Sequence, residues 1–139
     1  MAVDWRHIRE LVSLQLDKLS ADLRRVNQAI HGTPELAYHE FHAHYKLSDF
    51  LSTRGFAVER QTYGLATSFE ATAGSGGRLV VFCAEYDALP GLGHGCGHNL
   101  VATSSLGAFL GAAHVLRRLG LVGRVRLLGT PAEEGGGGK

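Results

Sequence analysis

The most constraining feature of the sequence is a pair of apolar segments separated by a glycine-rich loop and a long apolar stretch. Residues 79–84 are apolar without polar alternation, which is typical of a strand buried on both faces in a parallel sheet. Residues 99–119 have the length of a helix, and residues 125–129 form the second apolar segment. A strand, a helix and a strand in this order predict a right-handed parallel crossover.

The remaining segments extend this prediction to a whole fold. Residues 4–30 have apolar side chains at helical spacing, and residues 34–53 are expected to form a second helix that begins at its proline. Residues 56–61 and 66–72 are strand candidates, and residues 125–129 are expected at an exposed edge of the sheet. We therefore expect the α/β class, with a three-layer α/β/α arrangement in which a mostly parallel sheet is flanked by helices.

Composition places the chain among globular proteins and argues against two kinds of partner. Its 139 residues match one domain, and the net charge of +1 comes without a basic stripe, so we expect no nucleic-acid partner. Residues 100–116 are apolar enough to raise a membrane-spanning alternative. Polar side chains interrupt that stretch, so we favour a helix packed on a sheet and expect no membrane partner.

Cysteine usage bears on the compartment. The chain has two cysteines, and its first thirty residues contain no apolar signal segment. A secreted disulfide scaffold of this size normally contains more cysteines. These features predict a reducing, cytoplasmic location.

Cys96 and His98 form the first candidate metal site. They flank Gly97, which allows both side chains to turn toward one point, and they lie where the helix is expected to begin. A thiolate and an imidazole together suit zinc, with manganese or cobalt as alternatives, and a helix N-terminus favours the thiolate. Taken alone, the pair is more typical of a glycine-rich turn with a packed cysteine and a hydrogen-bonded histidine than of a metal site.

Glu133 and Glu134 follow the second apolar segment and strengthen the metal hypothesis. Adjacent carboxylates at the end of a buried strand are unfavourable unless they are solvated, paired or bound to a metal. The carboxyl ends of parallel strands meet at one edge of a sheet, so these side chains are expected beside Cys96 and His98. One carboxylate can then ligate the metal while the other acts as a general base.

Other polar residues receive weaker interpretations. Asp87 is expected to hold a ligand in place, whereas Glu85 either does the same, binds the metal weakly or is an ordinary loop carboxylate. His39, His42 and His44 do not share one helical face well and are expected on a solvated surface. Cys83 lies inside the first apolar segment and is expected in the core.

Three strings of residues resemble metallopeptidase family twenty. They are residues 84–90, residues 95–99 and residues 131–139, and the string His-Gly-Thr-Pro-Glu-Leu at 31–36 matches a fourth motif. The nearest branch is that of the amidohydrolases, which includes aminobenzoyl-glutamate hydrolase, indole-acetyl-amino-acid hydrolases and cytosolic dipeptidases. The resemblance implies a partial zinc-exopeptidase-like catalytic domain.

Carried over by position, the resemblance assigns roles to single residues. Cys96, His98 and Glu134 match metal ligands, Glu133 matches the general base, and Asp87 matches the aspartate of the first metal motif. Other branches of the family carry a histidine where this chain has Glu85. That difference fits the cysteine-containing amidohydrolase branch and leaves the role of Glu85 open.

The resemblance also implies an activity and a longer protein. The expected reaction is metal-dependent hydrolysis of amide bonds in dipeptides or N-acyl amino acids, by a full-length protein that is a homo-oligomer. We expect residues 1–139 to be the N-terminal portion of the catalytic domain, with the lid or dimerisation domain and the C-terminal catalytic portion absent. An inactive metal-binding or partner-binding fragment is the alternative, and a nucleotide-binding module is disfavoured because no phosphate loop is present.

Overall fold

The first helix of the computed structural model, which describes residues 4–139, matches the expectation closely. α1 spans Trp5–Gly32, and the carboxylate of Asp4 accepts hydrogen bonds from the backbone N–H groups of Arg6 and His7. An aspartate at this position satisfies N–H groups that have no partner within the helix. Val26 and Ile30, near the end of α1, are buried in the core.

The second helix is shorter than predicted. α2 spans Phe41–Ser52, so Pro34 does not begin a helix and residues 33–40 form an irregular segment instead. Tyr38 in that segment has a φ of 65°, which a helix cannot contain. The carboxylate of Glu35 accepts hydrogen bonds from the backbone N–H groups of His42 and Ala43 and thereby caps α2 from a distance in sequence.

Four strands form one mixed sheet in the order β1-β2-β4-β3. Their bounds are Ala57–Arg60 for β1, Phe69–Ser75 for β2, Leu79–Glu85 for β3 and Gly123–Thr130 for β4. β3 and β4 are parallel and are joined through α3, which spans His98–Leu119, as the crossover prediction requires. The other two pairings are antiparallel, so the α/β class is confirmed with a sheet that is mixed rather than mostly parallel in this chain.

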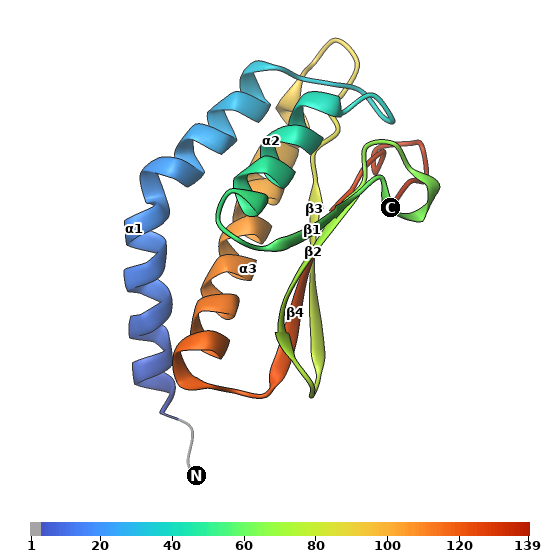
Figure 1. Ribbon diagram of the computed structural model, residues 1–139. Helices are drawn as coiled ribbons and strands as arrows, with labels where there is room; N and C mark the ends of the chain where they lie inside the picture. The colour runs from blue at the N-terminus through green and yellow to red at the C-terminus, as the bar shows by residue number, and fades with distance from the viewer. Residues whose placement is uncertain (1–3) are drawn as a thin grey trace.

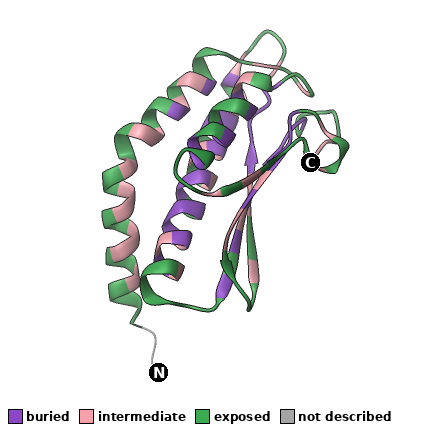
Figure 2. Cartoon of the chain, viewed as in Figure 1, coloured by how far each residue is buried: buried purple, intermediate pink, exposed green. Residues whose placement is uncertain are grey.

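The described helices cover one face of the sheet. Figure 1 shows α2 and α3 lying against the strands, with α1 packed on the far side of α3. Figure 2 shows that the buried residues, in purple, gather on α2, α3 and the strands that these helices cover. The layers of the described residues are therefore a sheet, two helices and a third helix, instead of helices on both faces. The largest fully buried apolar side chains of this core are Phe69, Tyr86, Phe109, Ile30, Leu47, Leu51, Leu106 and Leu127.

The edges of the sheet differ from the prediction. β3 is an edge strand, and Val80 and Val81 are 46% and 43% exposed, so the strand is not buried on both faces. Cys83 is only half-buried for the same reason. β4 lies between β2 and β3, so Val125 and Leu127 are buried, and the expectation of an exposed edge there was wrong.

α3 is long and apolar enough to cross a membrane by length and composition alone. Half of its most apolar window is buried inside the molecule, where α3 packs against β3, β4 and α1. A core helix passes the same test of length and hydropathy. The packing therefore accounts for the apolar composition of α3.

Candidate metal centre

Two polar loops begin side by side at the carboxyl edge of the sheet. Glu85 at the end of β3 pairs with Thr130 at the end of β4. The β3–α3 loop (residues 86–97) follows the first strand, and the β4 exit loop (residues 131–138) follows the second. The predicted adjacency of the two loops is confirmed, because parallel strands end at the same edge.

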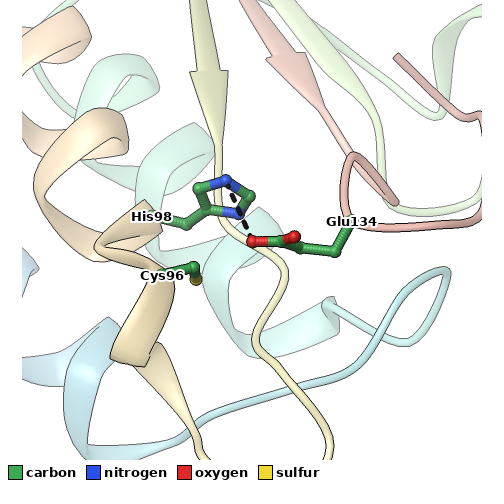
Figure 3. A group of neighbouring side chains, drawn as sticks. All are labelled: Cys96, His98 and Glu134. Atoms are coloured by element: carbon green, nitrogen blue, oxygen red, sulfur yellow. Dashed lines mark ion pairs between the residues drawn. The ribbon is translucent and has the colours of Figure 1, made fainter.

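Potential metal-ligand atoms converge between these loops in two overlapping groups. Cys96, His98 and Glu134 each place a ligand atom within 4.8 Å of the others, as Figure 3 shows. Glu85, His98 and Glu133 form a second group by the same measure. His98 belongs to both groups, so the cluster is a single centre.

His98 is held so that one ring nitrogen faces the carboxylates. Its Nδ1 lies 2.9 Å from the backbone oxygen of Asp87 and 3.1 Å from Asp87 Oδ1, both of which are acceptors. Nδ1 therefore carries the proton in the neutral ring, and Nε2 is left with a lone pair. Nε2 lies 3.3 Å from Glu85, 3.5 Å from Glu133 and 3.7 Å from Glu134.

Asp87 connects the two loops. Its side chain is fully buried, with Oδ1 on His98 and Oδ2 accepting the backbone N–H of Glu134 at 2.9 Å. It lies outside both groups of potential ligands, on the far side of the imidazole from them. This position suits a residue that orients a ligand, as expected for Asp87.

Cys96 is a thiol in a partly buried position. Gly97 has a φ of 86°, which lets the chain turn between Cys96 and His98 as the sequence predicted. Burial raises the pKa of Cys96, and the nearby Glu134 raises it further against the lowering effect of the His98 backbone N–H. The expected thiolate is therefore not favoured by the protein alone; a metal would have to displace the proton.

The charge of the cluster is strongly negative. Three carboxylates face the imidazole of His98, and within residues 4–139 Lys139 is the one lysine or arginine that pairs with any of them, at Glu85 Oε1. Like charges at this separation repel unless a cation lies between them. Thiol, imidazole and carboxylate donors together fit a divalent metal ion.

Comparison with known proteins bears on the chemistry of this centre. No protein-family model matches the chain. The chain is similar to a mouse Xaa-Arg dipeptidase, with 38% identity over 99% of this chain and 35% of the relative. It is also similar to one of the subunits of an Escherichia coli p-aminobenzoyl-glutamate hydrolase, with 34% identity over 88% of the chain and 30% of the relative.

The chain is also similar to a solved peptidase structure. A Bacillus subtilis dinuclear metal-binding peptidase of family M20 superposes with a TM-score of 0.69 and 26% identity, over 85% of this chain and 36% of that one. The predicted relationship to metallopeptidase family twenty is confirmed. The chain spans about a third of the length of these relatives.

Histidines outside the candidate metal centre were predicted less well. His39 precedes α2 and is exposed, as expected, whereas His44 is 1% exposed with Nδ1 on the backbone oxygen of Thr67. The solvated surface expected for all three is therefore wrong for His44, and His42 is half-buried. His44 faces inward because it lies on the buried face of α2, one turn before Leu47 and Ser48.

Two glutamates that contact the centre's loops were not singled out from the sequence. Glu35 accepts the backbone N–H of Ala88 through its main-chain oxygen at 2.7 Å, and Glu40 accepts the backbone N–H of Ala132 through Oε1 at 2.8 Å. Both lie in or just after the string at 31–36 that carries the resemblance. That motif was the available signal, but nothing in the spacing of its residues indicates a contact almost a hundred positions away.

Proposed function

We propose that this chain supplies metal ligands and the general base of an amide hydrolase. The arrangement of His98 is the observation that carries the proposal. Its Nδ1 is tied to a buried carboxylate, while its Nε2 faces three further carboxylates beside a thiol. An imidazole oriented by Asp87 in this way is the pattern of a metal-ligating histidine.

In the proposed centre Cys96, His98 and Glu134 hold a divalent metal, with zinc favoured over manganese or cobalt. A bound metal would polarise the scissile carbonyl and lower the pKa of a water molecule. Glu133, whose side chain is 35% exposed, accepts the proton of that water on a carboxylate oxygen and then delivers it to the leaving amine. Asp87 keeps the imidazole in the Nδ1–H tautomer throughout.

Dipeptides and N-acyl amino acids are the proposed substrates. The names of the relatives, a dipeptidase and a hydrolase of p-aminobenzoyl-glutamate, support small molecules with an amide bond. Because the chain spans about a third of their length, we propose that substrate-reading residues lie in further segments of a longer protein. A cytoplasmic location and a homo-oligomeric full-length protein belong to the same proposal.

Metal titration of the chain tests the centre itself. Zinc should bind the wild type, and Cys96→Ser should weaken binding while Cys83→Ser, on the edge strand, should not. We expect the chain alone to hydrolyse no dipeptide, because a water held by so incomplete a catalytic domain is not fixed within reach of Glu133. Turnover that disappears in Glu133→Gln would instead show that these residues are sufficient.

A chimera tests the reaction class. The chain is placed in the mouse Xaa-Arg dipeptidase in exchange for the segment that aligns with it. The proposal expects dipeptide hydrolysis that is lost in the Glu133→Gln chimera while zinc content is retained. A folded chimera that binds zinc and hydrolyses nothing would favour the second candidate, an inactive metal-binding or partner-binding chain, which the partial length of the chain supports.

A further inference from the structure

We propose that Glu40 is a positioning residue for the metal centre, acting through the turn at Ala132 that aims Glu133 and Glu134. The inference rests on the proposed function, because it assigns a role toward the same carboxylates. Glu40 immediately precedes α2, and its side chain is fully buried. It lies outside both groups of potential metal ligands.

Both carboxylate oxygens of Glu40 are used. Oε1 accepts the backbone N–H of Ala132 at 2.8 Å, and Oε2 accepts the hydroxyl of Thr67 at 2.8 Å. A buried carboxylate is unfavourable unless hydrogen bonds compensate for its lost solvation. Here the carboxylate contacts the β4 exit loop, where one of its two partners is the backbone N–H of Ala132, adjacent to Glu133.

Ala132 needs such support because its backbone is strained. Its φ is 56°, in the left-handed region that residues with a Cβ rarely adopt. This conformation turns the chain between the end of β4 and Glu133. The Glu40 bond therefore stabilises a turn that would relax to a more favourable φ without it, and relaxation would move both glutamates.

The segment that contains Glu40 also contacts the other loop. The backbone oxygen of Glu35 accepts the N–H of Ala88, the residue after Asp87, and the hydroxyl of Tyr38 donates to the backbone oxygen of Gly136. Residues 34–40, which we call the brace segment, thus touch the β3–α3 loop once and the β4 exit loop twice. The brace segment fixes one half of the centre relative to the other.

Variants can separate this role from general stability. Glu40→Leu keeps the volume and leaves the N–H of Ala132 without its partner. Glu40→Gln retains both bonds, because its oxygen can accept from Ala132 while its amide donates to Thr67 Oγ1. Leu51→Ala, in the fully buried far end of α2, is the matched control for lost stability without a change at the centre.

Two measurements on the full chain test the proposal. Amide hydrogen exchange at Ala132, without metal, reports the bond itself. Cobalt(II) titration, followed by the cobalt–thiolate absorption of Cys96, reports the assembled centre. In Glu40→Leu we expect faster exchange at Ala132 and cobalt affinity weakened by about tenfold or more, as for other residues that orient ligands. Glu40→Gln should restore both, and Leu51→Ala should lower Tm with cobalt affinity within about threefold of the wild type.

Several outcomes would overturn the proposal. Unchanged hydrogen exchange at Ala132 in Glu40→Leu would show that Glu40 does not protect that N–H. Unchanged cobalt affinity in the same variant would show that Glu40 does not position the centre. If Leu51→Ala weakened cobalt affinity as much as Glu40→Leu does, the effect would belong to lost stability. If Glu40→Gln were as defective as Glu40→Leu, the effect would belong to the lost charge. A wild type without a cobalt–thiolate band would count against the metal centre, and Ala132 exchange would still decide whether Glu40 holds the turn.

Discussion

The two loops of the candidate metal centre are held in different ways. The β3–α3 loop presents His98, whose side chain is 7% exposed, and it is closed by backbone hydrogen bonds between Leu89 and Gly93. The β4 exit loop presents Glu133 and Glu134, whose side chains are 35% and 29% exposed. The first loop is closed by two backbone hydrogen bonds of its own, whereas the second has one, between Gly138 and Ala132, and is also bound by the side chains of Asp87 and Glu40.

Removing the shared anchor should have the largest effect. Asp87→Ala leaves the N–H of Glu134 without its partner and leaves His98 Nδ1 only the backbone oxygen of residue 87, so the side-chain link between the two loops is lost. We expect metal affinity to fall by about 10–100-fold and the free energy of unfolding to fall by about 1–3 kcal/mol. Zinc titration and urea unfolding measure the two effects.

Asp17→Ala is the control for that variant, because Asp17 is an exposed aspartate on α1. Asp17→Ala should leave the free energies of zinc binding and of unfolding within about 0.5 kcal/mol of the wild-type values. If Asp87→Ala bound zinc as the wild type does, Asp87 would not orient the ligand, and the two loops would be held by other contacts.

Cys96 in the β3–α3 loop and Cys83 on the strand before it provide a matched pair. Cys96 lies within 4.8 Å of the His98 and Glu134 ligand atoms, whereas Cys83 lies on edge strand β3 and outside that group. Cys96→Ser should weaken zinc binding by about tenfold or more, because an alcohol replaces a soft thiolate ligand. Equal zinc dissociation constants for the two serine variants would exclude Cys96 as a ligand.

Within the β4 exit loop, the adjacent glutamates should separate in the same assay. Glu134→Gln removes a proposed ligand and should weaken zinc binding by about tenfold. Glu133→Gln should change zinc affinity by about threefold or less, yet lower turnover of an active chimera by about 10²–10⁴-fold as expected for a general base. Comparable losses of affinity in both variants would assign Glu133 to the ligands instead, through its group with Glu85.

The β3–α3 loop was also the more predictable of the two from sequence. Gly97 between Cys96 and His98 indicates a turn, and the start of α3 follows directly, so local spacing was enough to bring these ligands together. The proximity of Glu134 could be predicted as well, because strand order alone places it at the same edge. Residues 33–40 could not be predicted, since their conformation is set by hydrogen bonds to loops about fifty and a hundred positions away.

Sheet edges were mispredicted for a related reason. The apolar run of β3 resembles a strand covered on both faces, but in this chain β3 has one neighbour, and helices cover one face. The apolar composition of a strand predicts that both of its faces are buried. It does not identify the segments that bury them. The site residues suggested by the family resemblance stay a prediction, although the fold brings them together, whereas the placement of β4 in the interior required the antiparallel pairing of β2 with β4.

The smallest predicted effect concerns the region behind the β4 exit loop, where His44 shares the backbone oxygen of Thr67 with the hydroxyl of Tyr86. Burial lowers the pKa of His44 below its ordinary value of 6.5, and the positive charge of Arg60 lowers it further, against the raising effect of the Thr67 bond. As the pH falls below 6.5, His44 binds a proton in the unfolded chain but stays neutral in the folded chain. Its contribution to the free energy of unfolding is therefore fully present above pH 6.5. That contribution is lost as the pH falls from 6.5 through the lowered pKa of the folded chain.

The free energy of unfolding should therefore decrease as the pH is lowered from about 7.5 to about 5, and the decrease should be smaller in His44→Asn, whose amide keeps an N–H donor near the position of Nδ1. Burial also lowers the pKa values of His94 and His114, so only the difference between the two slopes belongs to His44. His39→Asn, at an exposed histidine, is the control and should keep the wild-type slope. Urea unfolding at each pH measures the slopes. A slope for His44→Asn equal to that of the wild type would mean that His44 accepts its proton in the folded chain, and that the contacts of Thr67 beneath the β4 exit loop tolerate a charge.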